Sequence, residues 1–421
     1  MDEKRYNEIE RMDSVAFDAL TDDEYQEFAR MWYDRQTDNS SALVDLQADI
    51  EAWQQGYREL WPSGFQYLDE ALGGGFMGEQ LICLGAISSL GKTSFALQIA
   101  TQLAEQGKDV LLISLEMSKN ELNAKTISRY SFIQTMKEDK FQQEYRMTTQ
   151  DILLGNIGGV MRGEDLVATD AKGAVYVNAY NATKRIAGNT RIFVGRNDVN
   201  VEKVRDLVSK HELFTGRKPF VILDYLQILR ESELAKTTEK RLLTDYDITT
   251  LKTIARDFTI PVMVISAFNR TSYLEPVSMG SFRESSGIEY SSDILLGMQY
   301  HGMDYYKHPF KDPDTDKYMG EVYESTQNHN TRVRDLLDQM NEDGAKGKSL
   351  TIELKIMKNR LGKKCSLLYD FYPAYNYYAE GTYHAYTVPD KYKKSLKTEN
   401  QSAGESSSVV SSGKDDSLGE V

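Results

Sequence analysis

Residues Leu81–Ala100 read LICLGAISSLGKTSFALQIA, and this stretch decides the fold. An apolar run leads into the loop SSLGKT at 88–93, and apolar residues then recur at the i, i+4 spacing of one helix face. A strand, a short loop and a helix in this order are typical of a phosphate-binding loop (P-loop), in which backbone N–H groups and the helix N-terminus face phosphate oxygens. Lys92 would then reach the outer phosphates, and the Thr93 hydroxyl would bind Mg²⁺.

The loop predicts ATP and Mg²⁺ as cofactors. One position departs from the usual pattern G-x-x-x-x-G-K-[S/T], because Ala86 stands where the first glycine belongs and Gly85 lies one residue earlier. The expected nucleotide-binding residues of the loop and its flanks are Ala86, Ser88, Ser89, Leu90, Gly91, Lys92, Thr93 and Ser94.

Two later apolar runs end in a carboxylate, one in Glu116 and the other in Asp224. The carboxyl ends of parallel strands meet at one edge of a sheet, so both acids are expected beside the P-loop. One could hold Mg²⁺ while the other polarises the attacking water. An acid after a strand is more often a helix cap or a turn residue, and only the P-loop in the same sheet favours the catalytic interpretation.

Apolar runs that alternate with helical patterns predict an α/β fold with a doubly wound, mostly parallel sheet. A helix is expected at Arg241–Phe258, before the fifth of these runs. The expected strands are Gln80–Ala86, Val110–Ser114, Thr190–Val194, Pro219–Leu223, Pro261–Ser266 and Asp293–Met298.

The first 60 residues form a separate acidic segment, with 16 acidic and 6 basic side chains. Two helices are expected in it. One runs from about Asp22 to Arg35 with Thr21 as its N-cap, and the other from about Leu43 to Leu60 with Ser40 or Ser41 as its N-cap.

The remaining chain is expected to hold one domain and a tail. Residues 61–390 would form the ATPase domain, with a polar stretch at about 300–349 that is either a disordered surface insertion or a docking site. Residues 391–421 are polar and rich in Ser and Gly, which predicts a disordered tail. Seven tyrosines between Tyr369 and Tyr386 are expected to pack rather than to stack on bases.

Composition excludes several classes of protein. The net charge of −14 argues against a globally basic nucleic-acid binder, although the body outside the acidic segment is near neutral and can hold a local basic groove. Two cysteines, Cys83 and Cys365, exclude a disulfide framework and a four-cysteine zinc site. No run of 18 apolar residues and no secretory signal is present, so we expect a cytoplasmic protein without membrane contact.

Five further motifs make the chain resemble the DnaB family of replicative hexameric helicases, from about Trp61 to Tyr378. The resemblance implies a RecA-like ATPase domain without the family's full N-terminal domain. It also implies a homo-oligomeric ring, a hexamer, that moves on single-stranded DNA, with loader or primase-like proteins as possible partners. The motifs are SLEMS at 114–118, LDYLQIL at 223–229, SAFNR at 266–270, RESSGIE at 283–289 and KNRLG at 358–362.

The resemblance also implies roles for individual residues. Glu116 would be the catalytic base and Asp224 the acid of the Mg²⁺ shell. Lys358 and Arg360 would reach into the nucleotide site of a neighbouring subunit, and Lys125 stands where an arginine beside the base is expected. The loop that would follow DNA phosphates contains Arg283, Glu284, Ser286 and Gly287.

Several alternatives stay open. A recombination ATPase that forms filaments on DNA would share the P-loop. A weakly hydrolysing, nucleotide-gated assembly or loading factor would explain Ala267, which replaces a glutamine of the family, and Lys125. RESSGIE could be a surface Arg–Glu pair and KNR a solvated hairpin tip. The segment Ala42–Leu60 could dock on an adjacent subunit or pack on its own core.

Overall fold

The computed structural model divides the chain into two compact units, Met1–Glu59 and Leu60–Val421, which are described separately. None of the helices in its described part is long and apolar enough to cross a membrane. The structure describes residues 2–10, 17, 20–55, 59–136, 143–162, 165–195, 198–229, 239–269, 273–282, 285–311 and 318–381.

The first unit contains the helices α1 (Glu3–Glu10), α3 (Asp22–Thr37) and α4 (Ser40–Gln54). The Thr21 cap is confirmed, since its side chain accepts the amide of Glu24 in a capping box. The prediction for α4 is wrong at both ends.

The N-cap of α4 is Asn39, which makes no side-chain cap bond. Ser40 instead lies inside the helix, where its amide and hydroxyl both donate to the carboxylate of Asp38, at 2.9 and 2.6 Å. The serine hydroxyl is thus used in a turn before the helix rather than as its cap.

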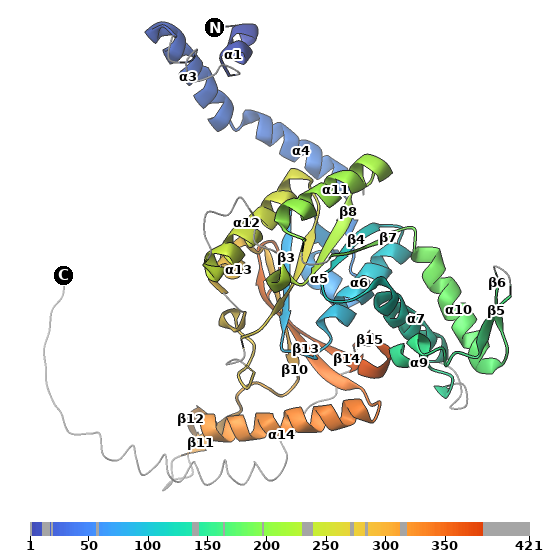
Figure 1. Ribbon diagram of the computed structural model, residues 1–421. Helices are drawn as coiled ribbons and strands as arrows, with labels where there is room; N and C mark the ends of the chain where they lie inside the picture. Colours follow the sequence, from blue (N-terminus) through green and yellow to red (C-terminus); the bar gives the residue numbers. More distant parts are fainter. Residues whose placement is uncertain are drawn as a thin grey trace, which may run out of the picture. The chain divides into compact units, whose positions relative to one another are not determined.

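The second unit is built on a nine-stranded sheet, shown in Figure 1, in the order β15-β14-β13-β10-β3-β9-β8-β4-β7. The strands from β10 to β7 in this order are parallel, and β13, β14 and β15 continue the sheet antiparallel. The bounds are β3 (Leu81–Ala86), β4 (Asp109–Ser114), β7 (Thr190–Val194), β8 (Pro219–Asp224), β9 (Val262–Ala267), β10 (Ile294–Tyr300), β13 (Leu350–Asn359), β14 (Ser366–Tyr372) and β15 (Tyr377–Glu380).

All six predicted strands are confirmed, with ends shifted by two residues at most. Every residue of β3, β4, β8 and β10 is buried, which is why these strands appear in the sequence as continuous apolar runs. The expected Arg241–Phe258 helix is α12 (Lys240–Asp257).

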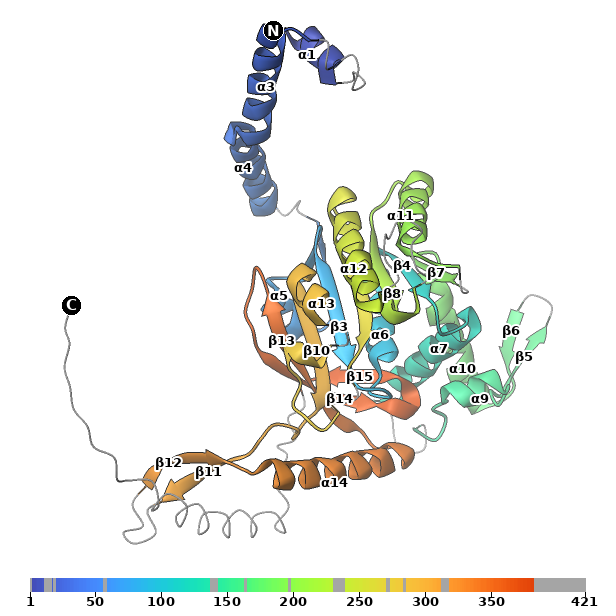
Figure 2. The ribbon, with the colours of Figure 1, turned by 60° about the vertical axis from the view of Figure 1, so that its left-hand side comes forward.

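Helices cover both faces of this sheet, as Figure 2 shows, so the doubly wound arrangement is confirmed. The helix α6 (Lys92–Glu105) crosses from β3 to β4, whereas α11 (Val201–Thr215) and α12 cross in the opposite direction and pack together on the other face. The further helices are α5 (Gln66–Leu72), α7 (Lys119–Thr135), α9 (Thr149–Leu153), α10 (Ala171–Ile186) and α13 (Ser285–Ser291). Small strand pairs are β1 (Leu60–Trp61) with β2 (Phe76–Met77), and β5 (Gly159–Arg162) with β6 (Asp165–Ala168).

The polar stretch at 300–349 is folded where the structure describes it, so the expectation of a disordered insertion is wrong there. It forms the hairpin strands β11 (Lys307–Lys311) and β12 (Tyr318–Tyr323) and the helix α14 (Thr326–Ala345). We call the described residues 305–311 and 318–345, which contain β11, β12 and α14, the inserted element. Figure 2 shows α14 across the end of the sheet at which β3 and β10 finish.

The C-terminal tyrosines pack, as expected, where they are described. Tyr369 and Tyr378 are almost fully buried in the core, and Tyr375 stacks on Phe132. Tyr383, Tyr386 and the tail predicted at 391–421 lie outside the described residues.

Candidate nucleotide-binding site

The P-loop connects β3 to α6, as the sequence predicts. Gly91 has φ +83°, in the left-handed region, and a Cβ atom at this position would lie 2.4 Å from the Tyr378 hydroxyl. Glycine is therefore required twice, by the backbone turn and by the close approach of β15. Ser89 is also left-handed, with φ +66°.

The expected metal-binding pair is brought together. The Thr93 hydroxyl donates to Oδ2 of Asp224 at 2.8 Å, across 131 residues of sequence. Strands β4 and β8 pair in register, and the amide of Leu115 donates to the Asp224 carbonyl at 2.7 Å. Glu116 follows directly, with an exposed side chain that lines the same cavity as Thr93 and Asp224.

Two charged groups of the site are strongly affected by burial. Burial lowers the pKa of Lys92 to about 8, although the carboxylates of Asp224 and Glu116 favour its charged form. Its ammonium donates to the carbonyls of Ala86 and Ile87, both at 3.0 Å. Burial raises the pKa of Asp224 to about 6, against the hydrogen bond from Thr93. The lysine and the acid therefore carry opposite charges near neutral pH.

The cavity in front of the P-loop has a volume of about 710 Å³. Ala86 and Leu90 do not line it. Ala86 offers only its carbonyl to Lys92, and Leu90 is buried beneath the loop, where its carbonyl accepts the Tyr378 hydroxyl. The predicted residues that do line it are Ser88, Ser89, Gly91, Lys92, Thr93, Ser94, Glu116, Lys125 and Asp224.

Gly85, which precedes the P-loop, has a packing role. A Cβ atom there would lie 2.4 Å from both Phe268 and Phe282, whose rings pack edge to face. The aromatic pair beneath the strand thus explains the glycine at position 85.

Asn376, which sequence reasoning missed, organises one wall of the cavity. Its Oδ1 accepts from the Lys125 ammonium at 2.7 Å and from the Ser94 hydroxyl at 3.0 Å, and its Nδ2 donates to Thr149 at 2.9 Å. No sequence signal marks Asn376, whose left-handed φ of +53°, a conformation that asparagine tolerates, is known only from the structure. Lys125 thus lines the cavity with its charged end already bonded.

Ala267 also lines the cavity, next to a glutamine from another strand end. Gln227 donates from Nε2 to the Ser266 hydroxyl at 2.8 Å, and its Oε1 accepts the amide of Ala267 at 3.3 Å. The carboxamide therefore bridges the chain after β8 to the end of β9, beyond the point where the two strands stop pairing.

Lys358 and Arg360 lie at the other edge of the sheet. Arg360 donates its amide to the Asp293 carbonyl at 3.1 Å, and the Asp293 amide donates to Leu81, the first residue of β3. Lys358 donates to the carbonyl of Glu289 at 2.6 Å. Because the P-loop follows the last residue of this six-residue strand, about 20 Å of sheet separates the two cations from it. Neither residue reaches the cavity of its own chain.

The loop expected to contact DNA is described only in part. Arg283 and Glu284 lie outside the described residues, as does the side chain of Ser286. Gly287 belongs to α13, where a Cβ atom would lie 2.0 Å from Oδ1 of Asp245 on α12. This glycine therefore has a packing reason, since it lets the two helices approach.

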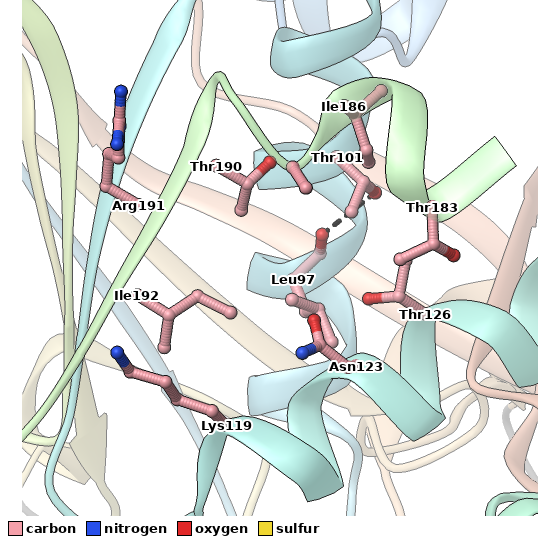
Figure 3. A pocket seen from close by; sticks show the side chains of 11 residues that line it. Leu97, Thr101, Lys119, Asn123, Thr126, Thr183, Ile186, Thr190, Arg191 and Ile192 are labelled. Carbon is pink, nitrogen blue, oxygen red and sulfur yellow. Dashed lines mark hydrogen bonds between the residues drawn. The ribbon is translucent and has the colours of Figure 1, made fainter. Parts of the chain in front are cut away.

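A second cavity, of about 350 Å³, lies between α6, α7, α10 and β7 (Figure 3). Lys119 and Asn123 of α7 and Thr190 and Arg191 of β7 line it, beside Leu97 of α6. It shares no lining residue with the cavity at the P-loop, so it is a separate space.

Comparisons with known proteins agree with this fold and site. A family model described as the DnaB-like helicase C-terminal domain matches residues 61–380. A probable replicative DNA helicase of Trieres chinensis is 26% identical over 238 residues, which are 56% of this chain and 46% of that protein. The replicative DNA helicase DnaB of Geobacillus stearothermophilus is 26% identical over 241 residues, which are also 56% of this chain and 46% of that protein. The chain thus spans about half the length of the curated relatives it matches.

Solved structures share the fold. One of them, described as an ATPase domain, has a TM-score of 0.59 at 20% identity, and the match covers 82% of this chain and 99% of that domain. A DnaB-like replicative helicase, described with its interactions with primase, has a TM-score of 0.57 at 22% identity, and the match covers 80% of this chain and 65% of that helicase. The expected RecA-like architecture is confirmed. Since the family model spans 320 of the 421 residues, the chain belongs to the family of DnaB-like helicase C-terminal domains.

Proposed function

We propose that this protein is an ATP-driven, ring-forming DNA helicase or translocase that acts on single-stranded DNA in replication. One observation carries the proposal. The phosphate-binding loop with Thr93, Asp224 and Glu116 lies at one edge of the parallel sheet, while Lys358 and Arg360 lie at the opposite edge of the same chain. Only a second copy of the chain can bring the two halves together.

The residues present suit Mg²⁺ and a nucleoside triphosphate. The Thr93 hydroxyl and the Asp224 carboxylate, already in contact, are the oxygen ligands that Mg²⁺ prefers, and Lys92 supplies a half-buried positive charge beside them. Bound Mg²⁺ neutralises charge on the phosphates and on the leaving group. Glu116 would hold the attacking water, and Arg360 of a neighbouring chain would stabilise charge on the transferred phosphoryl group, which is typically worth about 10³–10⁵ in rate.

Single-stranded DNA is the proposed polymer, and loader or primase-like proteins are the proposed partners. DNA would contact residues 283–287, so that hydrolysis moves one strand through the ring. A hexamer is the assembly that we expect.

A weakly hydrolysing assembly or loading factor is the second candidate. Ala267 favours it, because a methyl group lines the cavity at the position where the motif places a glutamine. The side-chain amide of Gln227 lies at that point instead, and it is bonded to the Ser266 hydroxyl and to the backbone amide of Ala267.

The test combines ATP turnover with mass in solution. A helicase is expected to form a closed ring with Mg²⁺ and ATP, and its turnover should rise when a single-stranded oligonucleotide is added. Slow turnover that DNA does not stimulate would favour the assembly factor. Open filaments in electron micrographs would favour a recombination ATPase, and a chain that stays monomeric under all conditions would contradict the ring.

A further inference from the structure

The inserted element carries a buried cluster of charged groups, formed by Glu324, His329 and Arg332. These residues are 5%, 0% and 0% exposed. Arg332 places Nη2 2.5 Å from Oε1 of Glu324 and donates to the carbonyls of Gly302 and Asp304 at 2.5 and 2.8 Å. Burial alone would raise the pKa of Glu324, but hydrogen bonds to His329 and Arg332 hold it at about 2. The cluster is therefore fully paired and fixes the start of α14 to the chain after β10.

His329 extends this cluster to a different part of the chain. Its Nε2 lies 2.9 Å from the carbonyl oxygen of Leu274, and because a carbonyl only accepts, Nε2 carries the hydrogen. The imidazole stacks on the ring of Tyr305, with centroids 3.7 Å apart, and the Tyr305 hydroxyl donates to Glu275 at 3.0 Å. Two neighbouring residues, Leu274 and Glu275, are thus held from the inserted element.

The segment 273–277, to which these residues belong, also touches the P-loop. The hydroxyls of Tyr273 and Ser88 lie 3.1 Å apart, and Ser88 lines the nucleotide cavity. At the other end of the segment, the Val277 amide donates to Gln299 of β10 at 2.7 Å. The segment therefore connects the P-loop to β10 and is held between them from the inserted element.

We propose that the Glu324–His329–Arg332 cluster is an anchor that holds segment 273–277 in place, so that this segment, through Tyr273 and Ser88, sets how strongly DNA stimulates turnover at the P-loop. His329 is the positioning residue of this device. The inference rests on the proposed function, because it concerns how DNA stimulates turnover. The bond to Leu274 and the contact of the same segment with the P-loop are the two links that the anchor requires.

The experiment compares two substitutions of His329 in the full chain. His329→Leu removes the donor to Leu274, whereas His329→Gln keeps an N–H group at nearly the same distance from the backbone. Hydrogen exchange of the amides at 274–277 is measured without nucleotide, and turnover is measured with and without a single-stranded oligonucleotide. In His329→Leu we expect faster exchange and a loss of about fivefold or more in the stimulation by DNA. In His329→Gln both should return to within about twofold of the parent chain.

Arg334→Leu is the matched control, because Arg334 lies exposed on the same helix. If the His329 variants do not fold, Tyr273→Phe removes only the hydroxyl that meets Ser88 and should lower the stimulation in the same way. Unchanged exchange and stimulation in His329→Leu, or a loss that His329→Gln does not restore, would overturn the anchor while the parent chain still responds to DNA. A parent chain whose turnover ignores DNA would instead overturn the proposed function, and the anchor with it.

Discussion

At the scale of single residues, the charge of Lys92 should control the affinity for nucleotide. Because burial lowers its pKa to about 8, the lysine loses its proton as the pH rises through that value. Phosphates favour the charged form, so affinity for a non-hydrolysable ATP analogue should fall as the pH rises through about 8, with proton uptake on binding. Asp224 should limit binding on the acid side. Its carboxylate takes up a proton as the pH falls through about 6, so Mg²⁺ binding should weaken there.

Calorimetric titration in two buffers of different ionisation enthalpy measures this proton uptake directly. Lys92→Arg is the control, because a guanidinium stays charged throughout and should abolish the uptake at high pH. An affinity for the analogue that does not change with pH in the parent chain would show that Lys92 is not titrating in the site.

Asn376 is the second residue whose contribution can be measured. It is 5% exposed and left-handed, and it bonds Ser94, Lys125 and Thr149. Asn376→Ala should lower the free energy of unfolding by about 2–4 kcal/mol, because it leaves buried polar groups unpaired and places alanine in a left-handed turn. Asn376→Gly should cost about 1 kcal/mol less, since glycine tolerates that conformation. Denaturant unfolding of the two variants compares these costs, and equal values would contradict the contribution of the turn.

Most of the predicted P-loop residues line the cavity, because their contacts are local or follow from strand order. Asn376 could not be found in this way, since 282 residues separate it from Ser94. Ala86 and Leu90 fit the motif by position, yet they face away from the cavity, and only the path of the backbone decides that. The roles of Lys358, Arg360 and the 283–287 loop stay predictions.

At the scale of elements, the crossing of α12 and α13 should depend on Gly287. An added Cβ atom would lie 2.0 Å from Oδ1 of Asp245 and 3.2 Å from its Cα, so part of the clash is with backbone. We expect Gly287→Ala to lower the free energy of unfolding by about 1–3 kcal/mol. Gly280→Ala is the matched control, because the nearest atom to its Cβ is 3.8 Å away.

Thermal unfolding of the two glycine variants tests the packing role. The control should change the stability by less than about 0.5 kcal/mol. If Gly287→Ala were as stable as the control, Gly287 would not be a packing residue, and a purely DNA-contacting role would be favoured.

Helices and strands could be predicted from the sequence where their buried residues are apolar. The parallel strands are buried on both faces and appear as continuous apolar runs, so their positions were predicted almost to the residue. The helix α14 was not predicted, because two of its buried positions are His329 and Arg332, which hydropathy counts as surface. Their burial is made possible by Glu324 and by backbone carbonyls, and no periodicity of apolar residues records such partners.

At the scale of the whole molecule, the distance of Arg360 from the P-loop of its own chain, together with the proposed ring, predicts complementation between chains. Lys92→Ala and Arg360→Ala should each abolish ATP turnover, and Arg360→Ala should still bind nucleotide. When the two variants are mixed, random pairing places an intact P-loop opposite an intact arginine at about one interface in four. Turnover should therefore reappear in the mixture.

Steady-state turnover of the two variants, alone and mixed, measures this effect. A mixture of the parent chain with Lys92→Ala controls for exchange of subunits. Mixtures that stay inactive although subunits exchange, or an Arg360→Ala chain that retains full turnover, would contradict the role of Arg360 across the interface.

The contact between β15 and the P-loop has a consequence for synthesis. Tyr378 donates its hydroxyl to the Leu90 carbonyl across 288 residues, and Gln98 of α6 pairs with the backbone of the same tyrosine through both ends of its carboxamide. On a ribosome the phosphate-binding turn emerges long before the strand that supports it from behind. The growing polypeptide thus carries the full motif without its backing until 288 further residues have been added, and the pocket cannot be completed before then.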